Sequence, residues 1–302
     1  MSMPAKRRAL ARQITRVTNA SVAQALSALK GAAIADSHRI AITGPPGAGK
    51  STLITSLARH RLESGASDQI AVLAVDPTSP VSGGSLLGDR IRMDAISDLP
   101  GLFIRSLPSR GARNGLCDNL EDLLQLVESH DYPEIILETV GVGQSEIDVR
   151  SITDTVMLVV PPDAGDSIQT MKAGIIEIAD IFVVSRGDAP QARRMASDIR
   201  SIVDRSAPSD TDWHPPVLLA ETTGRGIREL SDAIAAHAAW RKAREKPDDR
   251  RIARQNHHIR SLLARRIDEV LSEAEGPDTK DLKTSFDRIL ARLPIDGNGS
   301  GT

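Results

Sequence analysis

The sequence predicts an α/β fold with a mostly parallel sheet, helices on both faces of the sheet, and helical extensions at both ends of the chain. Three features support this prediction. A glycine-rich loop lies between a short apolar strand and a helix, strands and helices then alternate, and after Gly226 the pattern is nearly all helical. Alternation of this kind indicates a parallel sheet, because each parallel strand needs a crossover connection that a helix usually provides.

The glycine-rich loop matches the phosphate-binding pattern G-x-x-x-x-G-K-[ST] in full. It comprises Gly44, Pro45, Pro46, Gly47, Ala48, Gly49, Lys50, Ser51 and Thr52. Backbone N–H groups and a helix N-terminus would face the phosphates, Lys50 would reach the outer phosphates, and the Ser51 hydroxyl can bind Mg²⁺. A chance glycine-rich turn is the alternative, but the flanking apolar strand and helix argue against it. We therefore predict a nucleoside triphosphate site.

The strands and helices of the core can be placed from their apolar patterns. The expected strands are Ile40–Thr43, Ile70–Val75, Leu102–Arg105, Glu134–Leu137, Thr155–Val160, Ile181–Val184 and Val217–Ala220. The expected helices between them include Leu116–Ser129, Ser167–Ala179 and Gln191–Val203. In such a sheet, ligands bind at the carboxyl ends of the strands, where the phosphate loop already lies.

The chain divides into four parts in this prediction. Residues 1–36 form an N-terminal helical extension, 37–240 the nucleotide-binding domain, 241–295 a C-terminal helical arm, and 296–302 a disordered Gly/Ser tail. Pro247 is expected to separate two helices of the arm, and a last helix is expected near Asp278–Leu293.

The N-terminal extension is basic, with no acid before Asp36. A mitochondrial transit peptide has this composition, but so does a basic helix that packs on the folded body. Apolar residues near a 3.6-residue period favour the packed helix. They are Leu10, Ile14, Val17, Val22, Leu26 and Leu29.

The composition excludes several classes of protein. The net charge of −2 and the 2% aromatic content argue against a nucleic-acid partner and against base-stacking surfaces. No apolar run reaches the roughly 20 residues of a membrane helix. The single cysteine, Cys117, allows neither an intramolecular disulfide nor a zinc cluster. This cysteine content fits a reducing cytoplasm, which is the expected location. The mitochondrial matrix is the less favoured alternative.

Acidic residues after two strands are candidate Mg²⁺ ligands. Asp76 directly follows an apolar strand, and Asp89 lies in the glycine-rich segment beyond it. Mg²⁺ prefers oxygen ligands, usually one or two carboxylates together with phosphate oxygens and water. Each aspartate could instead be a helix cap or a turn residue.

Glu138 begins a third motif, Glu-Thr-Val-Gly-Val-Gly-Gln-Ser-Glu, at the end of the next strand. An acid followed three residues later by Gly141 has the logic of a GTPase switch, in which the glycine N–H senses the γ-phosphate and the acid holds Mg²⁺. Gln144 is a candidate for positioning the attacking water, although a solvated loop glutamine is an equal alternative.

Residues after the last two expected strands, Ile181–Val184 and Val217–Ala220, are expected to read the base. GTPases commonly carry the base-reading motif Asn-Lys-x-Asp after an apolar strand. In the corresponding segment of this chain, Asp188 can accept two hydrogen bonds from guanine and Arg186 can lie along the base plane. Ser185 takes the place of the asparagine and is shorter. The alternative is that this loop does not read the base. Glu221, Thr222 and Thr223 follow the last strand, where GTPases often place a backbone contact to the guanine oxygen.

Taken together, these strings resemble the MeaB/ArgK family of P-loop GTPases, chaperones of adenosylcobalamin-dependent methylmalonyl-CoA mutase and related acyl-CoA mutases. The resemblance covers about residues 7–237. It implies a GTP/GDP site, Mg²⁺ contacts from Ser51, Asp76, Asp89 and Glu138, and a homodimer formed by the C-terminal helices. It also implies a partner-facing switch loop at 162–172, with Asp163, Asp166, Gln169 and Lys172, and a mutase partner to which the adenosylcobalamin belongs.

Three segments differ from the family pattern. Its Asn-Lys-x-Asp is Ser185-Arg186-Gly187-Asp188 here, its Pro-Gly before the switch loop is Pro161-Pro162-Asp163, and its glycine-rich segment near 110–116 contains Arg113-Asn114-Gly115.

The leading hypothesis is a GTPase that gates cofactor loading and protects or reactivates a mutase. A nucleotide-sensing module with little turnover and a small-molecule kinase, as older family names suggest, are the alternatives.

Overall fold

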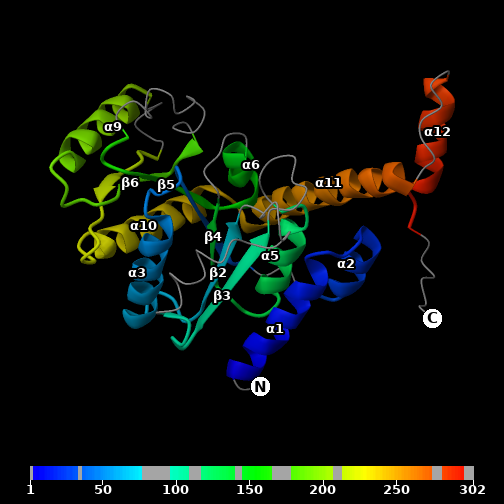
Figure 1. The fold of residues 1–302 in the computed structure, drawn as a ribbon, viewed down its shortest axis with the longest axis horizontal. Coiled ribbons are helices and arrows are strands. Elements are labelled where there is room, and N and C mark those ends of the chain that lie inside the picture. Colours follow the sequence, from blue (N-terminus) through cyan, green and yellow to red (C-terminus); the bar gives the residue numbers. More distant parts are fainter. Residues whose placement is uncertain are drawn as a thin grey trace.

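The computed structural model describes residues 3–32, 36–76, 96–108, 117–139, 145–164, 178–206, 213–273 and 281–295. Within these ranges a seven-stranded sheet has the order β3-β2-β4-β1-β5-β6-β7, and every neighbouring pair is parallel (Figure 1). The strands are β1 (His38–Thr43), β2 (Ile70–Asp76), β3 (Leu102–Pro108), β4 (Glu134–Glu138), β5 (Thr155–Val160), β6 (Ile181–Val184) and β7 (Val217–Leu219). The predicted fold class is confirmed.

Each expected strand is present, with differences at the ends. The largest difference is β3, which was expected to end at Arg105 and continues to Pro108. The extra residues pair with the end of β2, in a register that sets Asp76 opposite Pro108. The sequence did not indicate these residues as strand because the stretch mixes polar and apolar side chains. Hydrogen bonds from the neighbouring β2 backbone stabilise the strand there.

Helices cover both faces of the sheet because alternate strand residues point to opposite faces. On one face, α3 (Lys50–Glu63) and α10 (Ile227–Arg244) pack on residues such as Ile42 and Val159. On the other face, α1 (Met3–Val17) and α5 (Leu120–Glu128) pack on residues such as Leu73 and Leu137. Also on this second face, α6 (Ser145–Ile152) packs beside β1 and β5, and α9 (Ala192–Ser206) covers β5 and β6.

Two expected central helices differ from the prediction. The helix expected at Leu116–Ser129 begins later, at Leu120, and most of the helix expected at Ser167–Ala179 lies outside the described residues.

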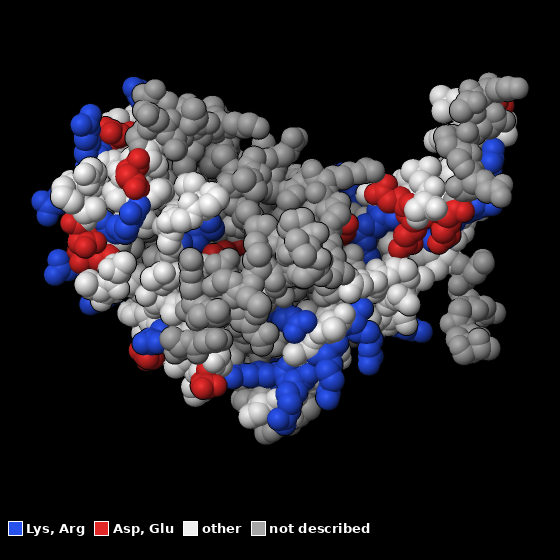
Figure 2. All heavy atoms as spheres, viewed as in Figure 1, with Lys and Arg blue, Asp and Glu red and all other residues white. Residues whose placement is uncertain are grey.

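The N-terminal extension consists of two helices, α1 and α2 (Val22–Ala28), where the sequence pattern indicated one continuous period. Ser21 caps α2 in a reciprocal capping box with Gln24, and this cap fixes the break. Five of the six periodic apolar residues are buried, whereas Leu26 is 44% exposed. Lysine and arginine side chains gather over α1 on the surface in Figure 2.

The predicted arm, 241–295, includes the end of α10 and the helices after it. Helix α10 ends at Arg244 and α11 (Pro247–Glu273) starts at the proline. Helix α11 has 27 residues, and its length of about 40 Å carries α12 (Leu282–Arg292) away from the sheet (Figure 1). The predicted tail at 296–302 lies outside the described residues. Across the described ranges, no helix combines the length and apolar character needed to cross a membrane.

Candidate nucleotide-binding site

The phosphate loop joins the end of β1 to the start of α3, as the motif predicts. Gly44 adopts φ +143°, and a Cβ atom there would lie 2.1 Å from the Val159 carbonyl oxygen of β5. Gly49 adopts φ +89° at the N-cap of α3. Glycine at 44 therefore lets the loop pass against β5, and glycine at 49 allows a left-handed turn into the helix.

Lys50 is the first residue of α3, and its side chain folds back over the loop. Its Nζ donates hydrogen bonds to the carbonyl oxygens of Gly44 at 2.9 Å and Pro45 at 3.2 Å. The residue is buried, at 9% exposure. The ammonium charge is thus held inside the loop, where phosphate oxygens would approach the N-terminus of α3.

Ser51 and Glu138 meet beside the loop, although 87 positions separate them in the sequence. The Ser51 hydroxyl donates a hydrogen bond of 2.8 Å to Glu138 Oε1, and both residues are buried. Adjacent strands position the carboxylate, because β1 pairs with β4 in a register that sets Ile42 opposite Glu138. A hydroxyl and a carboxylate side by side form an oxygen-only donor set, which is the type that Mg²⁺ prefers.

The other predicted metal and catalytic residues are only partly described. Asp76 closes β2, which neighbours β4, so its backbone lies at the same edge of the sheet as Glu138. Asp89, Gly141 and Gln144 lie outside the described residues. Within the described ranges, no three His, Cys, Asp or Glu side chains are grouped to hold a metal ion.

A pocket of about 270 Å³ lies beside the phosphate loop. It is lined by Gly47, Ala48, Gly49, Thr52, Leu53, Ser56, Ser185, Arg186, Ala220, Glu221, Thr222 and Ile227. Four predicted base-site residues, Ser185, Arg186, Glu221 and Thr222, are among them. Asp188 and Thr223 are exposed and are not lining residues.

Hydrogen bonds between strand ends shape this pocket. The Gly187 N–H donates to the Ala220 carbonyl at 2.9 Å, and the Ser185 N–H donates to the Val160 carbonyl at 3.0 Å. These bonds hold the loop after β6 against the chain that follows β7 and against the end of β5. Sequence reasoning missed Ser56 and Leu53 as lining residues, although their spacing from Thr52 and Gly49 along α3 is a helical one and could have indicated them.

Of the predicted partner-switch residues, Asp163 is described. It lies in a turn after β5 and accepts a hydrogen bond of 2.7 Å from Arg186 Nη2. Asp166, Gln169 and Lys172 lie outside the described residues.

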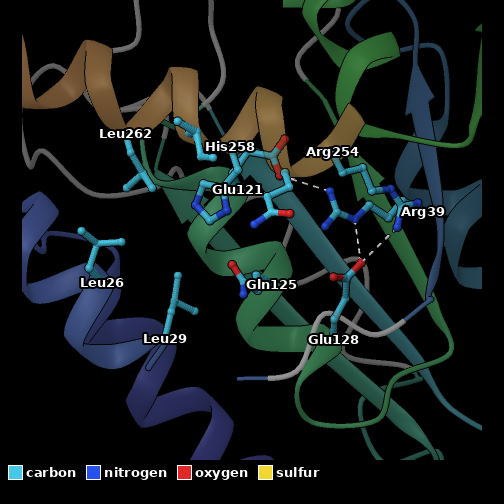
Figure 3. A pocket seen from close by; sticks show the side chains of 11 residues that line it. Leu26, Leu29, Arg39, Glu121, Gln125, Glu128, Arg254, His258 and Leu262 are labelled. Atoms are coloured by element: carbon cyan, nitrogen blue, oxygen red, sulfur yellow. Dashed lines mark hydrogen bonds and ion pairs between the residues drawn. The ribbon is translucent and has the colours of Figure 1, made fainter. Parts of the chain in front are cut away.

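A second cavity, of about 240 Å³, lies near the starting end of β1, away from the phosphate loop, between α2, α5 and α11 (Figure 3). Its polar wall is a buried ion-pair network: Arg39 of β1 binds Glu128 at 2.8 Å and Glu121 at 3.1 Å, and Arg254 of α11 lies 3.5 Å from Glu128 (Figure 3). Arg254 also pairs with Asp154, so the network attaches α11 to the nucleotide-binding domain. Sequence reasoning missed it, because paired charges distant in the chain have no local pattern.

A row of buried and half-buried polar side chains follows the starting ends of β1 and β5. The Thr155 hydroxyl lies 2.8 Å from both His38 Nε2 and His237 Nδ1, and His237 Nε2 lies 3.4 Å from Asp180. Burial lowers the pKa of His38 and of His237 to about 4 in each case. Burial also raises the pKa of the Cys117 thiol to about 12, which disfavours the reactive thiolate form.

A parallel sheet with a phosphate loop after β1, a buried lysine on that loop and an adjoining pocket defines a P-loop nucleotide-binding protein. A family model described as methylmalonyl-CoA mutase-associated GTPase MeaB matches residues 10–276. The chain belongs to this family and is a GTPase.

Relatives agree with this assignment. The chain is 39% identical over 293 residues to a Pyrococcus horikoshii protein named as a candidate GTPase, covering 94% of this chain and 92% of the relative. It is also 39% identical over 200 residues to the mouse methylmalonic aciduria type A homolog, mitochondrial, covering 65% of this chain and 48% of the relative. A crystal structure of a LAO/AO transport system kinase is similar in fold, with a TM-score of 0.61 at 22% identity, over 93% of this chain and 96% of the other.

Proposed function

We propose that this GTPase is a Mg²⁺-dependent chaperone of an adenosylcobalamin-dependent acyl-CoA mutase, gating loading of the cofactor and protecting or reactivating the mutase. The family description supports the link, since it names a mutase-associated GTPase, and so does the name of the mouse relative. The contact between Ser51 and Glu138 is the observation on which the proposed switch depends. It connects the phosphate loop directly to the segment that begins after β4.

In this proposal Ser51, Asp76, Asp89 and Glu138 hold Mg²⁺, directly or through water. The ion supplies positive charge to the phosphates when bound, whereas the chain supplies the oxygen donors and the Lys50 ammonium. The Ser51 hydroxyl that now donates to Glu138 is the group that would turn to the ion. A contact from the loop after β4 to the γ-phosphate, through Gly141, and placement of water by Gln144 complete the proposed switch.

Ser51→Ala and Asp76→Ala test the metal site. Each is expected to lower Mg²⁺-dependent GTP hydrolysis by about 100-fold, because a lost ligand weakens charge stabilisation in the transition state. Thr55→Ala is the matched control: its hydroxyl lies one turn further along α3 and bonds the Ser51 carbonyl at 2.8 Å. Normal hydrolysis in both the Ser51 and the Asp76 variant would remove the proposed metal site.

Guanine recognition is proposed for the loop after β6, with Arg186 along the base and Asp188 accepting two hydrogen bonds from it. Asp188 is exposed in this structure, so it must turn toward the pocket when nucleotide binds. Asp188→Asn should shift preference from guanine to xanthine nucleotides, whose 2-oxo group replaces the amine. An unchanged ratio of GTP to XTP affinity in that variant would show that the base is read elsewhere.

The mutase is proposed to contact the switch loop, including Asp163, Asp166, Gln169 and Lys172, and to accelerate hydrolysis that is slow in the free GTPase. GTP turnover measured with and without an adenosylcobalamin-dependent acyl-CoA mutase tests this point. Phosphate found on a small molecule would favour the kinase alternative. Bound GTP that stays intact for hours, with and without mutase, would favour the nucleotide-sensing alternative.

The C-terminal arm is proposed to form a homodimer in the cytoplasm. Helices α11 and α12 expose large apolar side chains, with Leu282 at 85% and Phe286 at 60% exposure and Leu263 and Leu271 about half exposed. Such a surface on a helical arm fits a second copy of the same arm. Leu263→Glu should convert a dimer to a monomer in sedimentation velocity, whereas Glu273→Lys, on the same helix, serves as the control. A monomeric parent protein would contradict the dimer.

A further inference from the structure

A side-chain contact joins two loops at the carboxyl ends of the strands, the end where the phosphate loop lies. Asp163 lies in the turn after β5 and Arg186 in the loop after β6, and these strands are neighbours in the sheet. Arg186 Nη2 donates to Asp163 Oδ1 at 2.7 Å. Both positions belong to segments in which the sequence differs from the family pattern described above.

The backbone of both loops is held in place by hydrogen bonds. After β5, the Ala164 N–H donates to the Pro161 carbonyl at 3.2 Å. After β6, the Ala189 N–H donates to the Arg186 carbonyl at 2.8 Å, and Gly187 lies so close to β7 that an added Cβ atom would be 3.1 Å from Leu219 Cβ. The two side chains therefore start from ordered turns.

Arg186 itself has an unusual backbone, with φ +48°. Few residues other than glycine adopt this left-handed conformation, and a bulky residue retains it when the surroundings over-determine it. This conformation brings the arginine to the rim of the pocket beside the phosphate loop, where it is one of the lining residues. The same side chain thus lines the pocket and binds Asp163.

We infer that Asp163 is a positioning residue for the nucleotide base. It holds the Arg186 guanidinium at the pocket rim, ready to lie along the base, and so couples the turn after β5 to the lifetime of the bound nucleotide. Coupling is reciprocal, so a partner that displaces Asp163 accelerates nucleotide release, and bound nucleotide holds that turn in place. The inference rests on the proposed base-reading role of Arg186.

The size of the effect follows from exposure. Side-chain exposure is 49% for Arg186 and 69% for Asp163, so water weakens the ion pair. An exposed pair of this type corresponds to about a two- to five-fold change in a rate or an equilibrium. Salt at 1 M shortens the screening length to about 3 Å and removes most of that difference.

Release of fluorescent GDP from the full chain, chased with excess unlabelled GDP, tests the inference. Asp163→Ala should accelerate release about two- to five-fold at low salt, and the difference from the parent protein should shrink at 1 M salt. In an Arg186→Ala background, Asp163→Ala should have no further effect. Asp198→Ala, an exposed acid on α9, is the control and should release GDP at the parental rate.

The outcomes separate this inference from the base site itself. Faster release from Arg186→Ala with no change in Asp163→Ala would overturn the coupling and leave Arg186 as a base contact. An equal effect of Asp163→Ala in both backgrounds would show that Asp163 acts by another route and would also overturn the coupling. Parental release from both single variants would overturn the coupling and the proposed role of Arg186 together.

Discussion

Arg61 and Glu134 form a buried ion pair whose removal should destabilise the fold strongly. Arg61 Nη2 and Nε contact Glu134 at 2.7 and 2.8 Å, and Arg61 Nη1 donates to the Ser231 hydroxyl at 2.8 Å. The side chains of the pair are only 6% and 5% exposed. The pair connects α3, β4 and α10, three elements that surround the core below the phosphate loop.

Arg61→Ala leaves the Glu134 carboxylate buried without its partner, which costs about 3–5 kcal/mol of unfolding free energy. Burial already raises the pKa of Glu134, and Arg61 opposes that rise. Without Arg61 the pKa of Glu134 rises further, so in the folded state its carboxyl group takes up a proton at a higher pH than in the parent protein. The cost should therefore be smaller at pH 5 than at pH 8, because protonation removes the uncompensated charge.

Urea denaturation at pH 5 and pH 8 measures both effects, with the double variant Arg61→Leu/Glu134→Leu as the control. The double variant should regain most of the lost stability, since no buried charge remains. The affinity for GDP should hardly change, because Arg61 lies 11 residues along α3 from Lys50, about 16 Å away. A cost below about 1 kcal/mol for Arg61→Ala, or a double variant as unstable as the single one, would refute this reasoning.

Two further predictions concern the phosphate loop and pH. Gly44→Ala should abolish GTP binding in calorimetry, because its Cβ would lie 2.1 Å from the Val159 carbonyl oxygen. Gly47 has φ +76° and open space around it, so Gly47→Ala should lower the free energy of unfolding by only about 1–2 kcal/mol. Stability should fall as pH drops from about 6.5 to about 4, on the order of 3 kcal/mol for each histidine, because the unfolded chain protonates His38 and His237 while the folded chain resists it. Denaturation curves across that pH range check this prediction, and a stability that does not change with pH would contradict neutral imidazoles at both positions.

Much of the fold could be predicted because its signals are local. The strands appear as apolar runs, and the phosphate loop appears as glycines, a lysine and a serine within nine residues. Where the prediction was wrong, a second local signal was overlooked or a neighbouring strand decided the outcome. Ser21 and Gln24 mark the start of α2 in the sequence itself, whereas β3 continues to Pro108 because β2 lies beside it.

The site was predicted in part. The sequence placed Ser51, Glu138 and Arg186 at strand ends where ligands bind, and the structure locates all three at that edge of the sheet. The family resemblance grouped Ser51 with Glu138 around one metal ion, but it indicated neither their direct hydrogen bond nor the contact of Arg186 with Asp163. The buried network of Arg39, Glu128 and Arg254 had no signal at all.

The sequence by itself determined the alternation of strands and helices and the loop that binds phosphate, since both depend on neighbours within a few residues. The tertiary structure alone decided which distant side chains meet: Ser51 with Glu138 across 87 positions, Arg61 with Glu134 across 73, and Arg186 with Asp163 across 23. The physical reason is the order of strands in the sheet. Burial of helices against both faces of that sheet sets the order, and no short stretch of sequence records it.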